Sequence, residues 1–138
     1  MTDFRDLFQH TQTIAVVGCS DKPYRTSHRI ATYLQSVGFR ILPINPHIKN
    51  DILGETCYPN LLSVPTEIKI DLVNIFRQPR YTASVVQEVL LRMDLTQERP
   101  VIWTQMGVSS EEARRIARTN GLTYITNRCT MVEHAYLV

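Results

Sequence analysis

Residues that could bind an anion follow the first apolar segment of the sequence. After Ile14-Ala15-Val16-Val17 comes a loop of small and basic residues that leads into a segment with helical spacing. The first N–H groups of a helix have no partner within the helix, and the positive dipole end attracts phosphate groups. The loop is therefore predicted to hold a diphosphate. Its small, polar and basic residues are Gly18, Ser20, Lys22, Arg25, Thr26 and Ser27.

Two further segment ends supply polar and aromatic groups to the same expected site. Asn45-Pro46-His47 ends the second apolar segment, and Phe76-Arg77 ends the third. Arg77 and His47 could pair with anionic groups of a ligand, and Phe76 is expected to be a pocket or core aromatic on which an adenine could stack. The alternative is that these are solvated loop side chains, and for His47 the sequence favours neither interpretation.

The pattern that binds nicotinamide dinucleotides is absent from the sequence. That pattern is Gly-x-Gly-x-x-Gly after the first strand, with an Asp or Glu near the end of the second strand for the ribose hydroxyls. Only Gly18 remains of the glycines here, and Asn45-Pro46-His47 offers no carboxylate. A nucleotide that carries an additional phosphate group is therefore favoured. An NAD(P)-binding redox or redox-sensing domain is the alternative.

Five apolar segments alternate with segments of helical periodicity, which is typical of βαβ units. Ser109 and Glu112 have the spacing of a capping box and mark the start of one helix. We expect an α/β fold with a doubly wound, Rossmann-like sheet of five parallel strands in the order 3-2-1-4-5, helices on both faces, and one domain over residues 1–138. Ligands of such sheets bind at the carboxyl edge where the strand order reverses, here between strands one and four. The expected strands are residues 14–17, 39–44, 70–76, 100–103 and 122–126.

Composition excludes several classes of protein. The 138 residues are 43% hydrophobic and 20% charged, with a net charge of +2 and no cluster of basic residues, so nucleic acid is not an expected partner. No apolar stretch approaches the roughly 18 residues that a membrane span needs. The first residues lack the features of a signal peptide, so a cytoplasmic location is expected. The three cysteines show no Cys-x-x-Cys spacing, which argues against a disulfide framework and a zinc site.

No catalytic residue and no metal ligand is assigned. Catalysis would need a nucleophile with a base, a metal cluster or a pair of carboxylates with separated pKa values. Cys129 and His134 have a spacing that could bring a thiol near an imidazole, but a structural thiol or a passive pocket wall is favoured. Either Cys19 or Cys129 could also form a mixed disulfide with a thiol ligand. Whether the chain is an enzyme stays open, with a binding module preferred.

The motifs of the chain resemble those of the single-domain coenzyme A-binding proteins. The likeness extends from about Thr13 to His134. The motifs that carry it are Val16-Val17-Gly18-Cys19-Ser20, Arg25-Thr26-Ser27, Pro43-Ile44-Asn45-Pro46, Val73-Asn74-Ile75-Phe76-Arg77, Trp103-Thr104-Gln105-Met106-Gly107 and Arg128-Cys129 through Glu133-His134. The resemblance implies a Rossmann-type fold similar to the coenzyme A-binding domain of the succinyl-coenzyme A synthetase alpha subunit.

The same resemblance implies roles for individual residues. Gly18, Ser20, Arg25 and Ser27 would hold phosphates, and Asn45-Pro46 with Phe76-Arg77 would flank the adenosine and the 3′-phosphate. The residues expected to line the pantetheine path are Trp103, Gln105 and Gly107. The remaining residues of the expected cofactor site are Cys19, Lys22, Thr26 and His47. The implied function is a module that binds coenzyme A or acyl-coenzyme A without catalysis of its own, as a sensor or as an accessory to a partner enzyme. A partner enzyme or a second copy of the chain is the possible protein partner. A further alternative is an interaction protein that keeps the fold without a working pocket.

Overall fold

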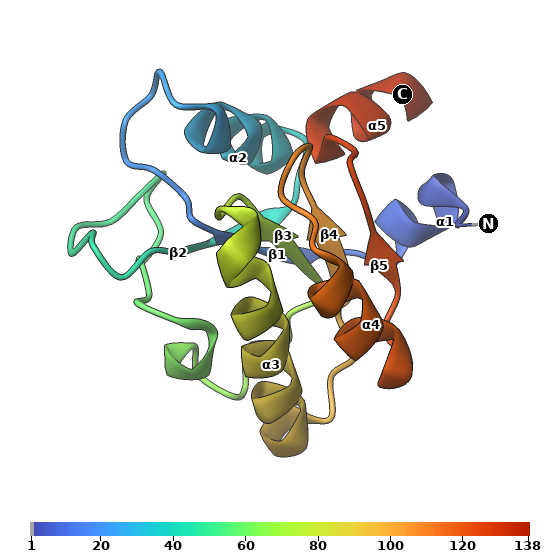
Figure 1. Ribbon diagram of the computed structural model, residues 1–138. Coiled ribbons are helices and arrows are strands. Elements are labelled where there is room, and N and C mark those ends of the chain that lie inside the picture. The colour runs from blue at the N-terminus through green and yellow to red at the C-terminus, as the bar shows by residue number, and fades with distance from the viewer. Residues whose placement is uncertain (1) are drawn as a thin grey trace.

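A five-stranded parallel sheet forms the centre of the molecule (Figure 1), and the computed structural model describes residues 2–138. The strands are β1 (Thr13–Val17), β2 (Arg40–Ile44), β3 (Leu72–Ile75), β4 (Val101–Thr104) and β5 (Tyr124–Ile125). Every residue of β1 and β3 is buried, as expected for strands covered on both faces. The predicted α/β class with a parallel, Rossmann-like sheet is confirmed.

The strand order is β2-β1-β3-β4-β5, which differs from the expected 3-2-1-4-5 in the place of one strand. β3 lies beside β1, with Ile14 opposite Leu72, instead of outside β2. The outer side of β2 is occupied by Tyr58, whose N–H donates to the Pro43 carbonyl oxygen at 3.0 Å. Pro43 has no N–H to donate and is tolerated in an edge strand, so it was a sequence signal for this position. The order therefore reverses between β1 and β3, and not between strands one and four.

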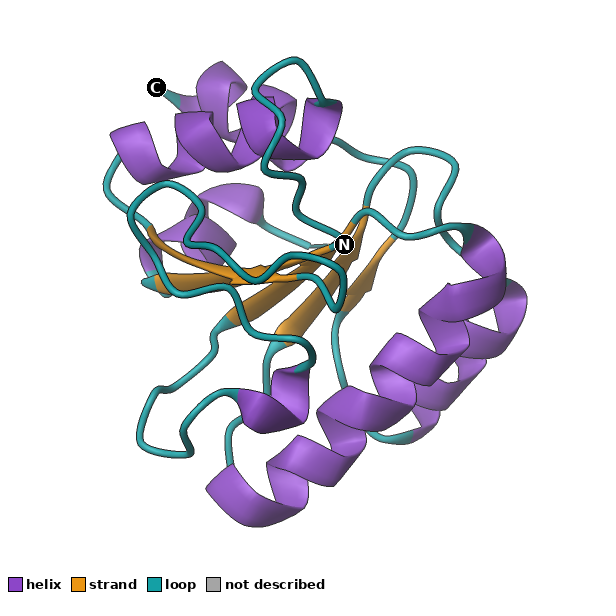
Figure 2. Ribbon diagram, turned by 90° about the vertical axis from the view of Figure 1, so that its left-hand side faces the viewer, coloured by secondary structure: helices purple, strands orange, loops and turns teal. Residues whose placement is uncertain are grey.

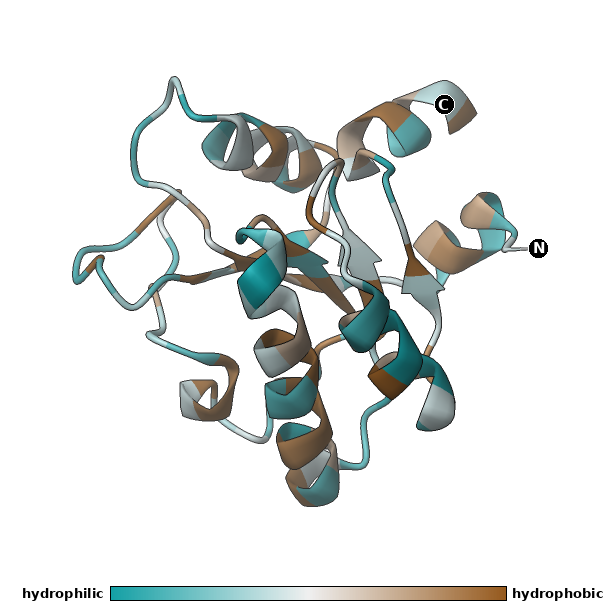
Figure 3. Ribbon diagram, viewed as in Figure 1, coloured by the Kyte–Doolittle hydropathy of each residue, from teal (hydrophilic) through white to brown (hydrophobic). Residues whose placement is uncertain are grey.

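Helices cover both faces of the sheet (Figure 2). One face packs against α1 (Phe4–Gln9), α2 (Thr26–Ser36) and α5 (Thr130–Leu137), and the other against α3 (Pro79–Thr96), α4 (Glu111–Thr119) and a short 3-10 helix, η1 (Leu61–Ser63). Val85, Val86 and Val89 of α3 are buried against the sheet, and its outward side carries both hydrophilic and hydrophobic residues (Figure 3). No helix within residues 2–138 combines the length and the apolar character that crossing a bilayer requires.

The start of α4 differs from the predicted capping box by one residue. The side chain of Ser110, not Ser109, accepts a hydrogen bond from the N–H of Ala113 at 3.1 Å. The Ser109 hydroxyl instead lies 3.0 Å from the hydroxyl of Tyr124 on β5. A tertiary contact therefore replaces the local one that the sequence spacing suggested.

Candidate functional site at the carboxyl edge of the sheet

Gly18 allows the ends of two strands to approach one another closely. It has a φ of +87°, which side chains rarely tolerate, and its N–H donates to the Ile44 carbonyl oxygen at 2.8 Å. A Cβ atom at this position would lie 3.2 Å from Cδ of Arg77. The loop after β1 and the loop after β3 are thus in direct contact at the point where the strand order reverses.

The loop between β1 and α2 is shaped by hydrogen bonds to Ser20 in the loop and to Ser27 in the first turn of α2. The N–H of Ser20 donates to Oγ of Ser27 at 3.0 Å, and the N–H of Lys22 donates to Oγ of Ser20 at 3.0 Å. Arg25 occupies the N-cap position of α2 and provides no side-chain hydrogen bond to the helix. Because no side chain caps it, the first turn of α2 keeps backbone N–H groups available for an acceptor from outside.

Two adjoining cavities open at this edge. One, of about 430 Å³, is lined by Gly18, Ser20, Arg25, Thr26, Ser27 and Phe76. The other, of about 330 Å³, is lined by Gly18, Asn45, Pro46, His47, Phe76, Arg77, Gln78, Arg80 and Tyr81. They share Gly18 and Phe76 and so form neighbouring halves of one site. The structure therefore brings together ten of the fifteen predicted cofactor-binding residues.

Cationic side chains dominate the second of these cavities. The guanidinium groups of Arg77 and Arg80 lie 4.6 Å and 4.8 Å from the centre of the Tyr81 ring. Of the described residues that line the two cavities, none is an aspartate or a glutamate. The site is therefore suited to an anionic ligand.

The side chain of Asn45 forms hydrogen bonds within the protein. Its Nδ2 donates to the Cys19 carbonyl oxygen at 2.9 Å, and its Oδ1 accepts a hydrogen bond from the N–H of His47 at 3.0 Å. These bonds fix the loop after β2 against the loop after β1. Asn45 therefore supports the cavity wall through hydrogen bonds within the protein.

Two predicted residues of the first loop lie outside the cavity walls. Cys19 is fully buried, and burial, with smaller contributions from the nearby charges of Cys57 and Asp21, raises the pKa of its thiol to about 12. Such a thiol is neutral and inaccessible, which argues against a mixed disulfide at this position. Lys22 is exposed and lines neither cavity.

The three residues expected along the pantetheine path also lie elsewhere. Trp103 is fully buried, packs against Phe4 and Phe8, and donates from Nε1 to the Arg128 carbonyl oxygen at 2.7 Å. Gln105 belongs to a buried polar network described below. Gly107 is exposed and lines neither cavity. The structure thus places these three residues away from the cavity walls.

Gln78, Arg80 and Tyr81 line the site and were missed from the sequence. They belong to the turn into α3 and its first residues, directly after the β3 exit. Pro79 was the available signal, because proline is common at the first position of a helix. A helix that starts there places its first turn at the carboxyl edge.

Cys129 and His134 do not form a nucleophile and base pair. Nδ1 of His134 lies 2.8 Å from the hydroxyl of Tyr33, and Glu133 pairs with Arg128 at 3.3 Å. Cys129 is the N-cap residue of α5. Among the hydrogen bonds of residues 2–138, its side chain forms none with Glu133 or His134. Within the same residues, no group of three potential ligands for a metal ion is found.

Proteins of known sequence or structure are similar to this chain over most of its length. The protein YneT of Bacillus subtilis is 35% identical over 133 residues, which are 96% of this chain and 93% of YneT. A solved hypothetical protein from Pyrococcus horikoshii has a TM-score of 0.90 at 33% identity, covering 99% of this chain and 92% of that protein. A Thermus thermophilus protein of known structure has a TM-score of 0.90 at 30% identity and full coverage of both chains.

A larger enzyme contains a related segment. The ADP-forming acetate–CoA ligase II of Archaeoglobus fulgidus is 32% identical over 90 residues, which are 64% of this chain but 12% of the ligase. The sequence pattern of the CoA binding domain family matches residues 12–135, nearly the whole chain. The chain therefore belongs to the CoA binding domain family.

Proposed function

We propose that this chain binds coenzyme A, or an acyl-coenzyme A, in the two adjoining cavities at the carboxyl edge. The observation that carries the proposal is that these cavities combine an uncapped helix N-terminus with the cations Arg25, Arg77 and Arg80 and are lined by no described acid. Coenzyme A carries a diphosphate and a separate 3′-phosphate, so it needs two anion-binding regions. Membership of the CoA binding domain family supports the same ligand.

The cavity at the start of α2 would take the diphosphate. Its backbone N–H groups and positive dipole end stabilise negative charge, and Arg25 supplies a guanidinium at the rim. Gly18 allows the ligand to approach the backbone because it has no side chain. These features would bind a phosphate group and would not select a particular base.

The cavity beside α3 would take the adenosine and its 3′-phosphate. Arg77 and Arg80 flank Tyr81, so the two guanidinium groups are held on one wall, with His47 also lining the cavity. Guanidinium groups bind phosphate through paired hydrogen bonds, and Phe76 offers an aromatic ring for a base. A ligand without the 3′-phosphate would leave the guanidinium groups of Arg77 and Arg80 without this anionic partner.

We further propose that the chain acts as a binding module, either as a sensor of coenzyme A or as an accessory to a partner enzyme. The ligase relative supports this view, because in that protein the related segment is a small part of a much longer chain. The chemistry of such an enzyme would then reside in a partner.

Titration calorimetry tests the proposal with coenzyme A, dephospho-coenzyme A, NAD⁺ and NADP⁺ as ligands. Coenzyme A is expected to bind most tightly. Arg25→Ala is expected to weaken it by about 1.5–3 kcal/mol, the usual contribution of a hydrogen bond to a charged group. Arg29→Ala is the matched control, because Arg29 lies one turn further along α2 and lines neither cavity.

Two results would contradict the proposal. Tighter binding of a nicotinamide dinucleotide would favour the redox alternative. No binding of any of the four nucleotides would indicate that the site does not function as a nucleotide pocket.

A further inference from the structure

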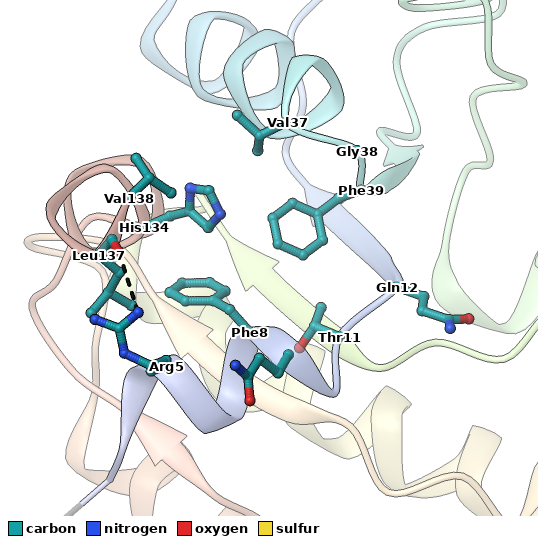
Figure 4. Close-up of a pocket in the computed structure, with 11 residues that line it drawn as sticks. Arg5, Phe8, Thr11, Gln12, Val37, Gly38, Phe39, His134, Leu137 and Val138 are labelled. Carbon is teal, nitrogen blue, oxygen red and sulfur yellow. Dashed lines mark hydrogen bonds between the residues drawn. The ribbon is translucent and has the colours of Figure 1, made fainter.

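Another cavity, of about 380 Å³, lies at the opposite edge of the sheet (Figure 4). It is formed by α1, by the segments that enter β1 and β2, and by the end of α5. Its volume falls within the range of small-molecule sites, about 300–1,000 Å³. The proposed function of the carboxyl edge does not use this cavity, and the two regions share no lining residue among the described residues.

Three aromatic rings line this cavity. The ring of His134 lies edge-on to Phe8 and Phe39, with 5.2 Å and 5.5 Å between ring centres, and Phe8 and Phe39 are 6.0 Å apart. The Tyr33 hydroxyl, 2.8 Å from Nδ1, fixes the imidazole. Burial lowers the pKa of His134 from its usual value of 6.5, so its ring is neutral at pH 7. The rings therefore present an uncharged aromatic surface.

Arg5 places a cation at the rim of the same cavity. Its Nη1 lies 3.4 Å from the Leu137 carbonyl oxygen (Figure 4), and no carboxylate among residues 2–138 forms an ion pair with it. Of the neighbouring acids of α1, Asp3 accepts the N–H of Asp6, and Oδ1 of Asp6 lies 3.4 Å from Nδ1 of His10. A guanidinium has five N–H donors, so most of those of Arg5 are available.

We propose that this cavity is a second ligand site, which takes a small monocarboxylate with a flat, aromatic body. The carboxylate accepts paired hydrogen bonds from Arg5, and the body packs on the rings of Phe8, Phe39 and His134. The combination of a cation that forms no ion pair among residues 2–138 and an uncharged ring surface favours an amphipathic anion over a sugar, a cation or a polyphosphate.

Phenylacetate and its uncharged isostere phenylacetamide are suitable probes, titrated into the full chain and followed by heteronuclear NMR. Phenylacetate is expected to cause saturable shifts around Phe8 and Phe39. Phenylacetamide is expected to bind about tenfold more weakly, because it lacks the charge that pairs with Arg5. Arg5→Gln should remove this difference and leave the affinity for phenylacetamide within about twofold.

Arg5 is exposed, so its replacement is not expected to affect folding. Arg115→Gln is the control, because Arg115 is an exposed arginine on α4 that lies outside the cavity. The proposal is wrong if neither probe saturates, if both bind equally, or if Arg5→Gln still prefers the acid. A coenzyme A titration of the same samples reports on the carboxyl edge independently.

Discussion

At the scale of single residues, Gly18 links backbone conformation to the two cavities at the carboxyl edge. Its φ of +87° and the 3.2 Å approach of Arg77 Cδ to the position of a Cβ atom are separate constraints. Gly107 has a similar φ of +77°, but nothing lies within 4 Å of its Cβ position. The two glycines therefore allow conformational strain to be distinguished from close packing.

Gly18→Ala is predicted to weaken coenzyme A binding as well as stability. Both Gly18→Ala and Gly107→Ala should lose about 1–2 kcal/mol of unfolding free energy, the cost of a side chain in the left-handed region. Only Gly18→Ala displaces Arg77, so it alone should also lose about tenfold in affinity, or about 1.4 kcal/mol. Urea unfolding and calorimetry measure the two effects. Equal affinities for the two variants would contradict the role of the close approach.

At the scale of elements, a buried ion pair fastens the segment between β2 and β3 to α3. Nε of Arg92 on α3 donates to Oε1 of Glu98 at 2.5 Å, and both side chains are nearly inaccessible. Arg92 also donates to carbonyl oxygens of η1 and the loop that follows it. Glu98 Oε2 accepts the N–H of Ile70, close to β3. These bonds replace a regular helix in that connection.

Arg92→Met is predicted to destabilise the protein by about 3–5 kcal/mol, because it leaves the Glu98 carboxylate buried without its partner. Arg92→Met combined with Glu98→Gln should lose less, since the amide oxygen of Gln can still accept the N–H of Ile70. Urea unfolding measures both. A loss under about 1 kcal/mol in the single variant, as for an exposed pair, would show that the ion pair does not hold this segment.

At the scale of the whole molecule, a buried polar network joins the sheet to the layer of α1, α2 and α5. Nδ2 of Asn74 on β3 donates to Oε1 of Gln105 at 3.0 Å, and the hydroxyl of Thr130 on α5 donates to Oδ1 of Asn74 at 2.8 Å. All three residues are buried. Satisfied networks of this kind hold distant elements in one arrangement. Because the network ties these elements together, the free energy of global unfolding is a suitable measure of how a buried group titrates.

The stability of the whole molecule is predicted to fall in alkaline solution through Cys19. Its folded pKa of about 12 exceeds the ordinary value of 9.0, mainly because of burial. Below pH 9 the thiol is neutral in both states, and between pH 9 and 12 only the unfolded chain ionises, so unfolding becomes easier by about 1.4 kcal/mol per pH unit. Above pH 12 the dependence ends.

Denaturant unfolding at about pH 8 and about pH 10.5 tests this prediction under reducing conditions. The loss of stability between the two pH values should be about 2 kcal/mol smaller in Cys19→Ala than in the native chain. Lysines and tyrosines titrate in both proteins, so their contributions cancel in the comparison. An identical loss in both would show that Cys19 does not ionise differently on folding.

The sequence by itself determined the fold class and most of the residues that line the two cavities at the carboxyl edge. Apolar runs and helical spacing depend on local patterns, and they placed Gly18, Asn45 and Arg77 at strand exits and Arg25 at the start of α2. Parallel strands share one carboxyl edge, so these residues had to meet near the same place.

The tertiary structure decided the order of the strands and the direction of each side chain. Tyr58 occupies the outer side of β2, and Trp103 turns into the core between the sheet and α1 instead of toward a ligand. Both outcomes depend on which distant surfaces bury one another, and sequence spacing reports only local periodicity. The aromatic cavity at the opposite edge arose in the same way, because Phe8, Phe39 and His134 meet only after α5 has packed against α1 and α2.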